Sequence, residues 1–417
     1  MKNKDEKNNL TSTISNVTNE MVYNNDFKDA VKKNPFDFIR NRKMPFEEVV
    51  IFVLMSFKCS TQSALRRFFT MLGKSTFMQQ QSFSEARAKI SVTAFVMLFK
   101  ATVKVMTEAC NNNWHGYLVH AIDGSKIALP SDKTLRAHFG TIGRGSKSPT
   151  AQGSILYDVL NDIIIDAALE PMATDERTLA EAHIDASKSI RPDEKKLIIF
   201  DRGYPSFELI EKLENDGIAY VMRVREKFNL EIDAQKNSDG YVIIKKGDKS
   251  LSVRVVKFLL DSGEMETLIT NITDKRLGKK AFKRLYFMRW PVEIKYDIVK
   301  NKLQLENFNT RTVEGVGQDF FASMYLANVA AAAAIDAQPE IEEARKDKDN
   351  KYEYHANINE LVGILKDRFV MALTEDSEEK QIERIQCIIE EIKRAVVPKR
   401  ENRTKPRNPS PRKCKRL

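Results

Sequence analysis

The feature that most restricts the fold is a series of short apolar segments, separated by turn signals, between residues 116 and 226. Runs of about four to eight residues rich in Val, Ile and Leu are typical of buried strands, and longer amphipathic runs are typical of helices. Their order is strand, hairpin, helix, strand, helix, strand, which predicts a mixed α/β domain. The predicted strands cover 117–122, 153–160, 163–171, 195–200 and 218–226, and the predicted helices cover 178–189 and 206–217.

Two of the predicted strands carry an aspartate. Asp123 follows the apolar run 117–122, and Asp201 comes directly after the run 195–200. Because Asp-Gly is a common turn signal, a structural turn is the alternative interpretation of Asp123 and Gly124. The apolar pattern resumes soon after Gly124, however, which favours a strand that continues through the aspartate. Both aspartates are therefore candidate site residues.

A third acid, Glu293, lies close in sequence to Tyr286, Arg289 and Lys300. From Tyr286 to Lys300 the successive offsets are three, four and seven residues, so one α-helix would present all four side chains on one face. The alternative is an ordinary surface helix with an i,i+4 ion pair between Arg289 and Glu293. Pro291 complicates a single helix, because proline breaks a helical hydrogen bond and suits a first turn. A helix that begins near Pro291 would leave Tyr286 and Arg289 in a preceding segment.

The pattern Tyr-x2-Arg-x3-Glu-x6-Lys, with Trp290 directly after the arginine, resembles the signature of bacterial insertion-sequence transposases of the DDE type, the IS-four group. The predicted order of strands and helices is also that of the RNase H-like fold. The resemblance implies an α/β, RNase H-like catalytic domain over about 111–340, with a β-rich insertion at about 227–275 ahead of the acid-bearing helix. It is carried by Asp123, by Asp201 with the Arg-Gly-Tyr that follows, and by 286–300.

Asp123, Asp201 and Glu293 are the predicted catalytic and metal-binding residues. Three carboxylates held close together repel one another unless cations lie between them, and hard oxygen ligands select Mg²⁺ or Mn²⁺. Two such ions about 4 Å apart can activate a water or a 3′-hydroxyl on one side and stabilise the leaving oxygen on the other. The resemblance implies that Asp123 bridges both ions and that Asp201 and Glu293 each hold one.

The resemblance also implies DNA contacts from the segment that carries Glu293. Tyr286, Arg289 and Lys300 are predicted to hold phosphates of the terminal DNA, with the guanidinium in a bidentate arrangement. Trp290 is predicted either to stack on a displaced base or to pack in the core, and the core role is the commoner one for a tryptophan.

The rest of the chain divides by composition. Residues 1–30 are polar and rich in Asn, which predicts a flexible N-terminus. Residues 31–110 show apolar residues at helical spacing, which predicts a helical region, and 341–397 predict a second, C-terminal helical region. The basic residues of 31–110 suit DNA phosphates, although comparable densities occur on ordinary helical surfaces. They include Arg40, Arg42, Lys43, Arg66, Arg67, Arg87 and Lys89. The resemblance implies a helical region here that binds the element ends, so 31–110 is the predicted DNA-binding region.

The excess of positive charge is concentrated in the last residues. Of 68 basic and 58 acidic residues, eleven basic and one acidic lie in 393–417, which leaves 57 of each sign in the rest of the chain. The tail, 398–417, has almost no apolar residues, so we expect it to be disordered until it meets a polyanion such as DNA. A solubilising end is the alternative interpretation.

Composition excludes several other classes. The four cysteines form no C-x-x-C pair and the five histidines form no ligand-spaced cluster, which argues against a zinc ribbon and a disulfide framework. No apolar run reaches about 18 residues, so a membrane span is not expected. The first residues have no apolar core typical of a secretory signal. A reducing cytoplasm fits best. The resemblance implies that it is a bacterial cytoplasm and that the protein is associated with the nucleoid.

These inferences predict a DNA transposase that cleaves double-stranded DNA at the terminal inverted repeats of an insertion sequence and joins the ends to target DNA. Because two element ends must be paired, a homodimer on DNA is the expected assembly. One alternative is another RNase H-like, metal-dependent endonuclease, which would share the acids but not depend on Tyr286, Arg289 and Lys300. A second alternative is a domesticated protein that binds DNA without cutting it.

Overall fold

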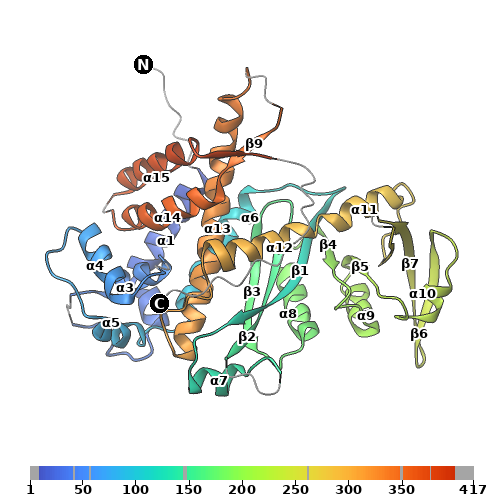
Figure 1. The fold of residues 1–417 in the computed structure, drawn as a ribbon, viewed down its shortest axis with the longest axis horizontal. Coiled ribbons are helices and arrows are strands. Elements are labelled where there is room, and N and C mark those ends of the chain that lie inside the picture. Colours follow the sequence, from blue (N-terminus) through green and yellow to red (C-terminus); the bar gives the residue numbers. More distant parts are fainter. Residues whose placement is uncertain are drawn as a thin grey trace.

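One eight-stranded mixed sheet forms the centre of the computed structural model (Figure 1), with strand order β3-β2-β1-β4-β5-β8-β7-β6. The structure describes residues 9–40, 43–55, 58–143, 148–260, 263–347, 351–375 and 377–399. Arg42 and nearly all of the basic tail lie outside these ranges, so the predictions made for them are not examined by the structure.

Five strands form the half of the sheet that the sequence predicts. β1 (Tyr117–Ala128) pairs antiparallel with β2 (Thr150–Asp158), and β2 pairs antiparallel with β3 (Ile163–Pro171). On the other side of β1, β4 (Lys195–Phe200) and then β5 (Ala219–Arg223) are parallel to it. Three antiparallel strands followed by two parallel ones, with the order 3-2-1-4-5, is the topology of the RNase H-like fold. The predicted fold class is therefore confirmed.

Helices connect these strands, as the apolar patterns predict. α8 (Glu176–Ser189) links β3 to β4 and packs against β1, β2 and β3. α9 (Phe207–Asn215) links β4 to β5, and Gly217 follows it with a φ of +65°, a left-handed conformation that glycine adopts without strain. A further short helix, α7 (Lys133–Phe139), lies between β1 and β2.

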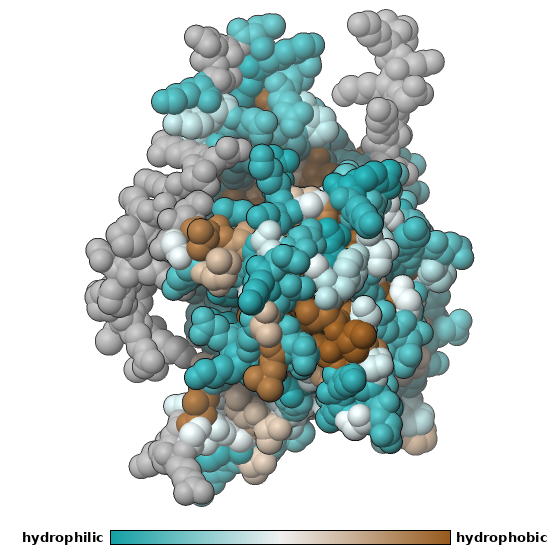
Figure 2. Space-filling view, turned by 90° about the vertical axis from the view of Figure 1, so that its right-hand side faces the viewer, coloured by the Kyte–Doolittle hydropathy of each residue, from teal (hydrophilic) through white to brown (hydrophobic). Residues whose placement is uncertain are grey.

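The β-rich segment predicted at about 227–275 continues the central sheet. After the short helix α10 (Leu230–Ala234) it forms β6 (Asp239–Lys246), β7 (Lys249–Leu259) and β8 (Met265–Thr270), and β8 pairs antiparallel with β5. Figure 2 looks at this end of the molecule, which is mostly hydrophilic with local apolar patches. The exposed apolar side chains of these strands include Ile243, Leu259 and Met265.

Helices also fill the segment ahead of β1, and they begin earlier than the sequence predicts. Residues 1–30 were expected to be flexible, but α1 (Leu10–Tyr23) and α2 (Asn25–Val31) are regular helices. Asp336 anchors the start of α1, because its carboxylate accepts the backbone N–H groups of Leu10 and Thr11 at 3.0 and 2.8 Å. The helices that follow are α3 (Phe46–Leu54), α4 (Thr61–Met71), α5 (Gln80–Arg87) and α6 (Thr93–Ala109).

The long helix α13 (Val313–Glu343) joins the two halves of the molecule, since it packs against α1, α3, α6 and β3. Within the described residues it is the one helix long and apolar enough to cross a membrane, but 78% of its most apolar stretch is buried inside the fold, as a core helix would be. The chain then forms a small two-stranded sheet and two packed helices. These are β9 (Tyr354–Ala356), α14 (Ile358–Leu373), α15 (Glu378–Ile392) and β10 (Val396–Pro398).

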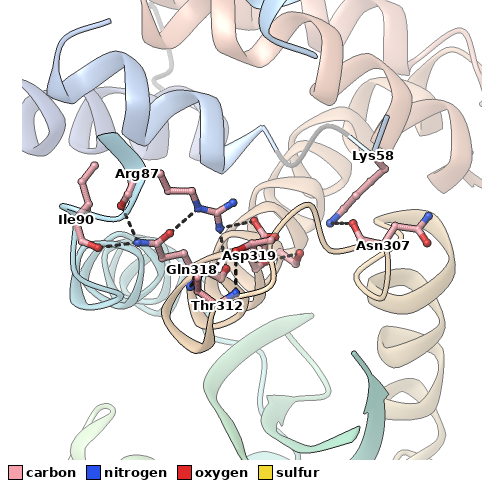
Figure 3. A network of polar contacts seen from close by, with 10 residues as sticks. Lys58, Arg87, Ile90, Asn307, Thr312, Gln318 and Asp319 are labelled. Carbon is pink, nitrogen blue, oxygen red and sulfur yellow. Dashed lines mark hydrogen bonds and ion pairs between the residues drawn. The ribbon is translucent and has the colours of Figure 1, made fainter. Parts of the chain in front are cut away.

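A buried polar network fixes α5 to the first turns of α13 (Figure 3). The Arg87 guanidinium donates to the Gln318 Oε1 at 2.6 Å, to the Gly315 carbonyl at 2.7 Å and to the Asp319 carboxylate at 2.8 Å. Arg87 is only 7% exposed. The prediction that Arg87 is a surface cation available to DNA is therefore wrong, because Asp319 already neutralises its charge inside the fold.

Candidate active site

The pairing of β1 with β4 brings the two aspartates together. β4 pairs only with residues 117–121 of β1, in a register that matches Ala121 with Ile199. Continued by two residues, the same register places Asp123 beside Asp201, which follows the last residue of β4. Neighbouring strands lie about 4.8 Å apart, so these two carboxylates are close neighbours at the carboxyl ends of parallel strands. Ligands commonly bind at such ends in open α/β sheets.

The segment that carries Glu293 covers the edge of β1 that β4 leaves unpaired. The Tyr296 hydroxyl donates to the Asp123 carbonyl at 2.9 Å, and the Lys300 ammonium donates to the Lys126 carbonyl at 2.6 Å. Further along, the Glu306 carboxylate accepts the Ala128 N–H at 3.0 Å. These three contacts satisfy backbone groups that would otherwise lack a strand partner, and they hold the helix over the aspartates.

The helix itself is interrupted where Pro291 predicts a break. α11 (Lys279–Phe287) ends before Met288 and Arg289, and α12 (Trp290–Asp297) carries the proline in its first turn. Met288 and Arg289 keep right-handed helical angles, so the chain continues in nearly the same direction. After α12 comes one π-helical turn, η1 (Ile298–Lys302), which contains Lys300. Such turns often mark functional sites.

The side chains of Tyr286, Arg289 and Glu293 reach the same site in spite of the break. The Tyr286 hydroxyl donates to Asp201 at 3.1 Å, and the Arg289 guanidinium donates to Glu293 at 2.6 Å. Arg223 of β5 approaches the Asp201 carboxylate at 4.0 Å. Tyr286 and Arg289 are both buried, at 7% and 8% exposed. In this conformation they face the acids and not the solvent.

Burial and mutual repulsion shape the electrostatics of the acids. Burial raises the pKa of Asp123 from 3.8 to about 6, Arg289 opposes this rise, and the charges of Glu293 and Asp201 add to it. The pKa of Tyr286 is raised to about 12, first by burial and then by the Asp201 charge. The three carboxylates therefore lie within one another's electric field, with Arg289 as the cation among them.

Two residues of the site were not among the sequence candidates. Glu176 begins α8, and its carboxylate oxygens lie 3.2 and 3.9 Å from where a Cβ on Gly124 and on Gly203 would be. Tyr204 is buried, and its hydroxyl has no hydrogen-bond partner among the residues described. The motif Asp-Arg-Gly-Tyr after β4 could have pointed to Tyr204. Nothing local marks Glu176, which reaches the site only through the packing of α8.

A buried hydrogen-bond network of Ser154, Asp166 and His183 lies next to the site and has a structural role. The ring of His183 bonds Asp166 at 2.8 Å and Ser154 at 2.9 Å, an arrangement of residues found in hydrolases. Ser154 and His183 are 2% and 0% exposed, so no substrate can reach the serine hydroxyl. The network ties β2, β3 and α8 together beneath Asp123.

The donor set suits a divalent cation in its chemistry, since all the candidate ligands are carboxylate oxygens. Within the described ranges, however, no three His, Cys, Asp or Glu side chains converge closely enough to hold an ion. Instead, the Glu293 carboxylate forms an ion pair with the Arg289 guanidinium.

The exposure of Trp290 decides between its two predicted roles, and Lys300 is partly buried. Trp290 is 52% exposed, so the core role expected for a tryptophan is wrong here. Phe287, the last residue of α11, and Ile294 of α12 are also exposed. Lys300 is half-buried against the β1 edge, and burial lowers the pKa of its ammonium.

Comparison with known proteins shows similarity to transposases. The family described as "Transposase DDE domain" matches residues 114–329, more than half of the chain. The chain is 22% identical over 187 residues to "Putative transposase InsZ" of Escherichia coli (strain K12), covering 43% of this chain and 60% of that protein. It is 22% identical over 139 residues to "Putative transposase y4zB" of Sinorhizobium fredii (strain NBRC 101917 / NGR234), covering 30% and 39%. The matches thus span less than two thirds of either relative.

Among solved structures, a chain of the piggyBac transposase synaptic complex with hairpin DNA aligns with 90% of this chain and 85% of its own length, at a TM-score of 0.48 and 10% identity. The family match covers β1 to β8, the acid-bearing helix α12 and the first half of α13. The prediction of a DDE transposase family is confirmed: the chain belongs to the transposase DDE domain family.

Proposed function

We propose that this protein is a cut-and-paste DNA transposase of an insertion sequence, of the IS-four group, with Asp123, Asp201 and Glu293 as its catalytic residues. It hydrolyses phosphodiester bonds at the terminal inverted repeats and transfers the freed 3′-hydroxyl ends into target DNA. The observation that carries the proposal is the register of β1 and β4, which makes Asp123 and Asp201 neighbours under the helix that carries Glu293.

Members of this family generally use divalent metal ions, and we propose two Mg²⁺ or Mn²⁺ ions held by the three acids. When bound, such ions activate the attacking hydroxyl and stabilise charge on the leaving oxygen. The chain's own contribution is to hold the acids in place. Tyr286 fixes the Asp201 carboxylate, and Tyr296 fixes the backbone at Asp123.

We propose that Arg289 leaves Glu293 and binds a DNA phosphate when the DNA arrives. In this structure its guanidinium bonds Glu293, while its Nε is buried without a hydrogen-bond partner among the described residues. A backbone phosphate arriving with the DNA offers two oxygens to that planar fork. Transfer of Arg289 to the phosphate would free the Glu293 carboxylate for a cation and place the scissile strand beside the acids.

The remaining DNA contacts are proposed from the same helix. The exposed Trp290 and the half-buried Lys300 lie on the side that the terminal DNA would meet, and Trp290 is proposed to stack on a displaced base. Tyr286, buried beside Asp201, is proposed to contact a phosphate next to the acids. The helices in 31–110 and the basic tail would add sequence-independent phosphate contacts. Pairing of two ends implies a homodimer on DNA in the bacterial cytoplasm, at the nucleoid.

The proposal is tested with purified protein, Mg²⁺ or Mn²⁺ and a labelled duplex that carries the terminal repeat of its own element. Nicking or double-strand release at the repeat boundary is expected from the wild type, and binding without cleavage from Glu293→Gln. The matched control is Asp297→Asn, because Asp297 is an exposed acid one turn further along the same helix. It should cleave like the wild type.

Two outcomes would point elsewhere. Sequence-specific binding without cleavage by any variant would refute the catalytic assignment and favour a domesticated DNA-binding protein. Cleavage that survives Tyr286→Phe, Arg289→Gln and Lys300→Gln would favour another RNase H-like endonuclease, since such an enzyme shares the acids without depending on these three residues.

A further inference from the structure

A cleft of about 650 Å³ lies between the N-terminal helices and the segment that follows η1. Residues from α5, from the start of α4 and from 308–312 form its walls, and Pro130, just past the end of β1, completes it. Figure 3 shows this region from close by, with Lys58, Arg87 and Asn307 among its labelled residues. The cleft is separate from the acids, but β1 connects the two places.

The charge of the cleft is unbalanced. Its lining, with that of a smaller cavity beside it, includes the cations Lys33, Lys58, Arg87 and Arg311 and the carboxylates Glu314 and Asp319. The carboxylates are already paired, Glu314 with Lys33 at 3.2 Å and Asp319 with Arg87 at 2.8 Å. Among the described residues, neither Lys58 nor Arg311 has a carboxylate within ion-pair distance. A formal charge of +2 is therefore left uncompensated.

The contacts of Lys58 are weak for an ammonium group. Its Nζ lies 3.5 Å from the Asn307 carbonyl and 6.0 Å from the centre of the Phe308 ring. Burial lowers the pKa of Lys58, which the Asp319 charge opposes and the Arg87 charge reinforces. Arg311 is exposed and lines the cleft, whereas Lys58 lines the smaller cavity beside it. An anion in the cleft would supply the partner that both cations lack.

The backbone and hydroxyl groups of the cleft also suit an anion. α4 begins at Thr61 after the cap Ser60, and α13 begins after the cap Thr312, so the positive ends of an 11-residue and a 31-residue helix open at the cleft. Helix N-termini favour phosphate oxygens. The Thr61 hydroxyl also lines the cleft and adds a neutral donor that suits a phosphodiester without adding charge.

We infer that this cleft binds backbone phosphates of the same DNA duplex whose scissile bond lies at the acids, an inference that rests on the proposed function. Pro130 lies seven residues beyond Asp123, which is about 23 Å along an extended strand. Duplex DNA rises about 3.4 Å per base pair. Lys58 and Arg311 therefore contact phosphates about six or seven base pairs from the cleavage site, and the β1 edge with Lys126 and Lys300 lies between.

The first test measures salt dependence in EDTA, where no cleavage occurs. Each neutralised phosphate adds about 0.9 to the slope of log K against log salt, so Lys58→Gln/Arg311→Gln should lower the slope by about 1.8. Between 50 and 200 mM salt the wild-type affinity would then fall about tenfold more than that of the variant. The matched control is Lys236→Ala/Lys245→Ala, two exposed lysines at the far end of the sheet.

The second test locates the contact by phosphate ethylation interference on a duplex that carries the element's own terminal repeat. Interference about six or seven base pairs from the cut, present with wild type and absent with Lys58→Gln/Arg311→Gln, supports the inference. An unchanged salt slope, an equal loss in the control, or interference that the variant retains overturns it. If the wild-type protein shows this interference but never cleaves DNA, the inference that the cleft binds phosphates is supported and the proposed catalytic function is refuted.

Discussion

Replacing Arg87 should destabilise the protein strongly, because the guanidinium neutralises a buried acid. Arg87→Met would leave the Asp319 carboxylate, which is 7% exposed, without its ion pair at 2.8 Å. It would also remove the donors to Gln318 and to the Gly315 carbonyl. Breaking one partner of a buried pair typically costs about 3–5 kcal/mol. Lys58 lies close enough to offset part of the Asp319 charge, so we expect about 3 kcal/mol.

Differential scanning calorimetry gives the first measurement. With an unfolding entropy of about 2.1 cal/mol/K per residue over 417 residues, a loss of about 3 kcal/mol lowers the Tm by roughly 3 °C. Arg66→Met, which removes an exposed arginine from α4, is the control and should cost less than about 1 kcal/mol.

A double-mutant cycle separates the pair from the rest of the network. Arg87→Met/Asp319→Leu replaces both charges by apolar groups, so it should be less destabilised than the sum of the two single variants by about 1–3 kcal/mol. The reasoning is refuted if Arg87→Met costs under about 1 kcal/mol, or if the two single effects simply add.

Three further predictions concern single side chains. Burial lowers the pKa of His120 to about 3, below its unfolded value, so stability should fall as pH drops from about 6.5 towards 3; a smaller fall in His120→Gln, measured by urea unfolding, would confirm it. Arg289→Met should raise the pKa of Asp123 above about 6, measured by carboxyl ¹³C NMR without metal; an unchanged pKa would contradict the geometry. Trp290→Ala should cost less than about 1 kcal/mol by thermal unfolding, and a loss of about 3 kcal/mol would show that it packs in the core.

The part of the sheet from β1 to β5 could be predicted because its strands are buried on both faces. Such strands require continuous apolar sequence, as in the five residues from Leu197 to Asp201, where the apolar run stops at the acid. The hairpin of β2 and β3 and the helices α8 and α9 also follow from local patterns and turn residues. Gly217, at +65°, ends α9 where the sequence predicts it.

The N-terminal helices could not be predicted in the same way. The buried face of α1 carries Thr11, Ser15 and Thr18 beside its apolar residues, and a polar sequence of this kind resembles a loose terminus. The partners of the two threonine hydroxyls are far away in the chain. Asp336 accepts the Thr11 hydroxyl at 2.6 Å, and Thr18 bonds the Tyr325 hydroxyl at 2.7 Å. Burial of these side chains depends on α13, which is more than 300 residues distant.

The sequence by itself determined the order of the strands, the positions of the three acids along the chain and the spacing of Tyr286, Arg289 and Glu293, because these depend on periodicity over a few residues. The tertiary structure decided which charges are available. Arg87 is buried, Trp290 is exposed, and Glu176 lies in the site. The local sequence around each of these residues does not show this. The physical reason is that desolvation and pairing of a side chain are set by atoms contributed from distant segments.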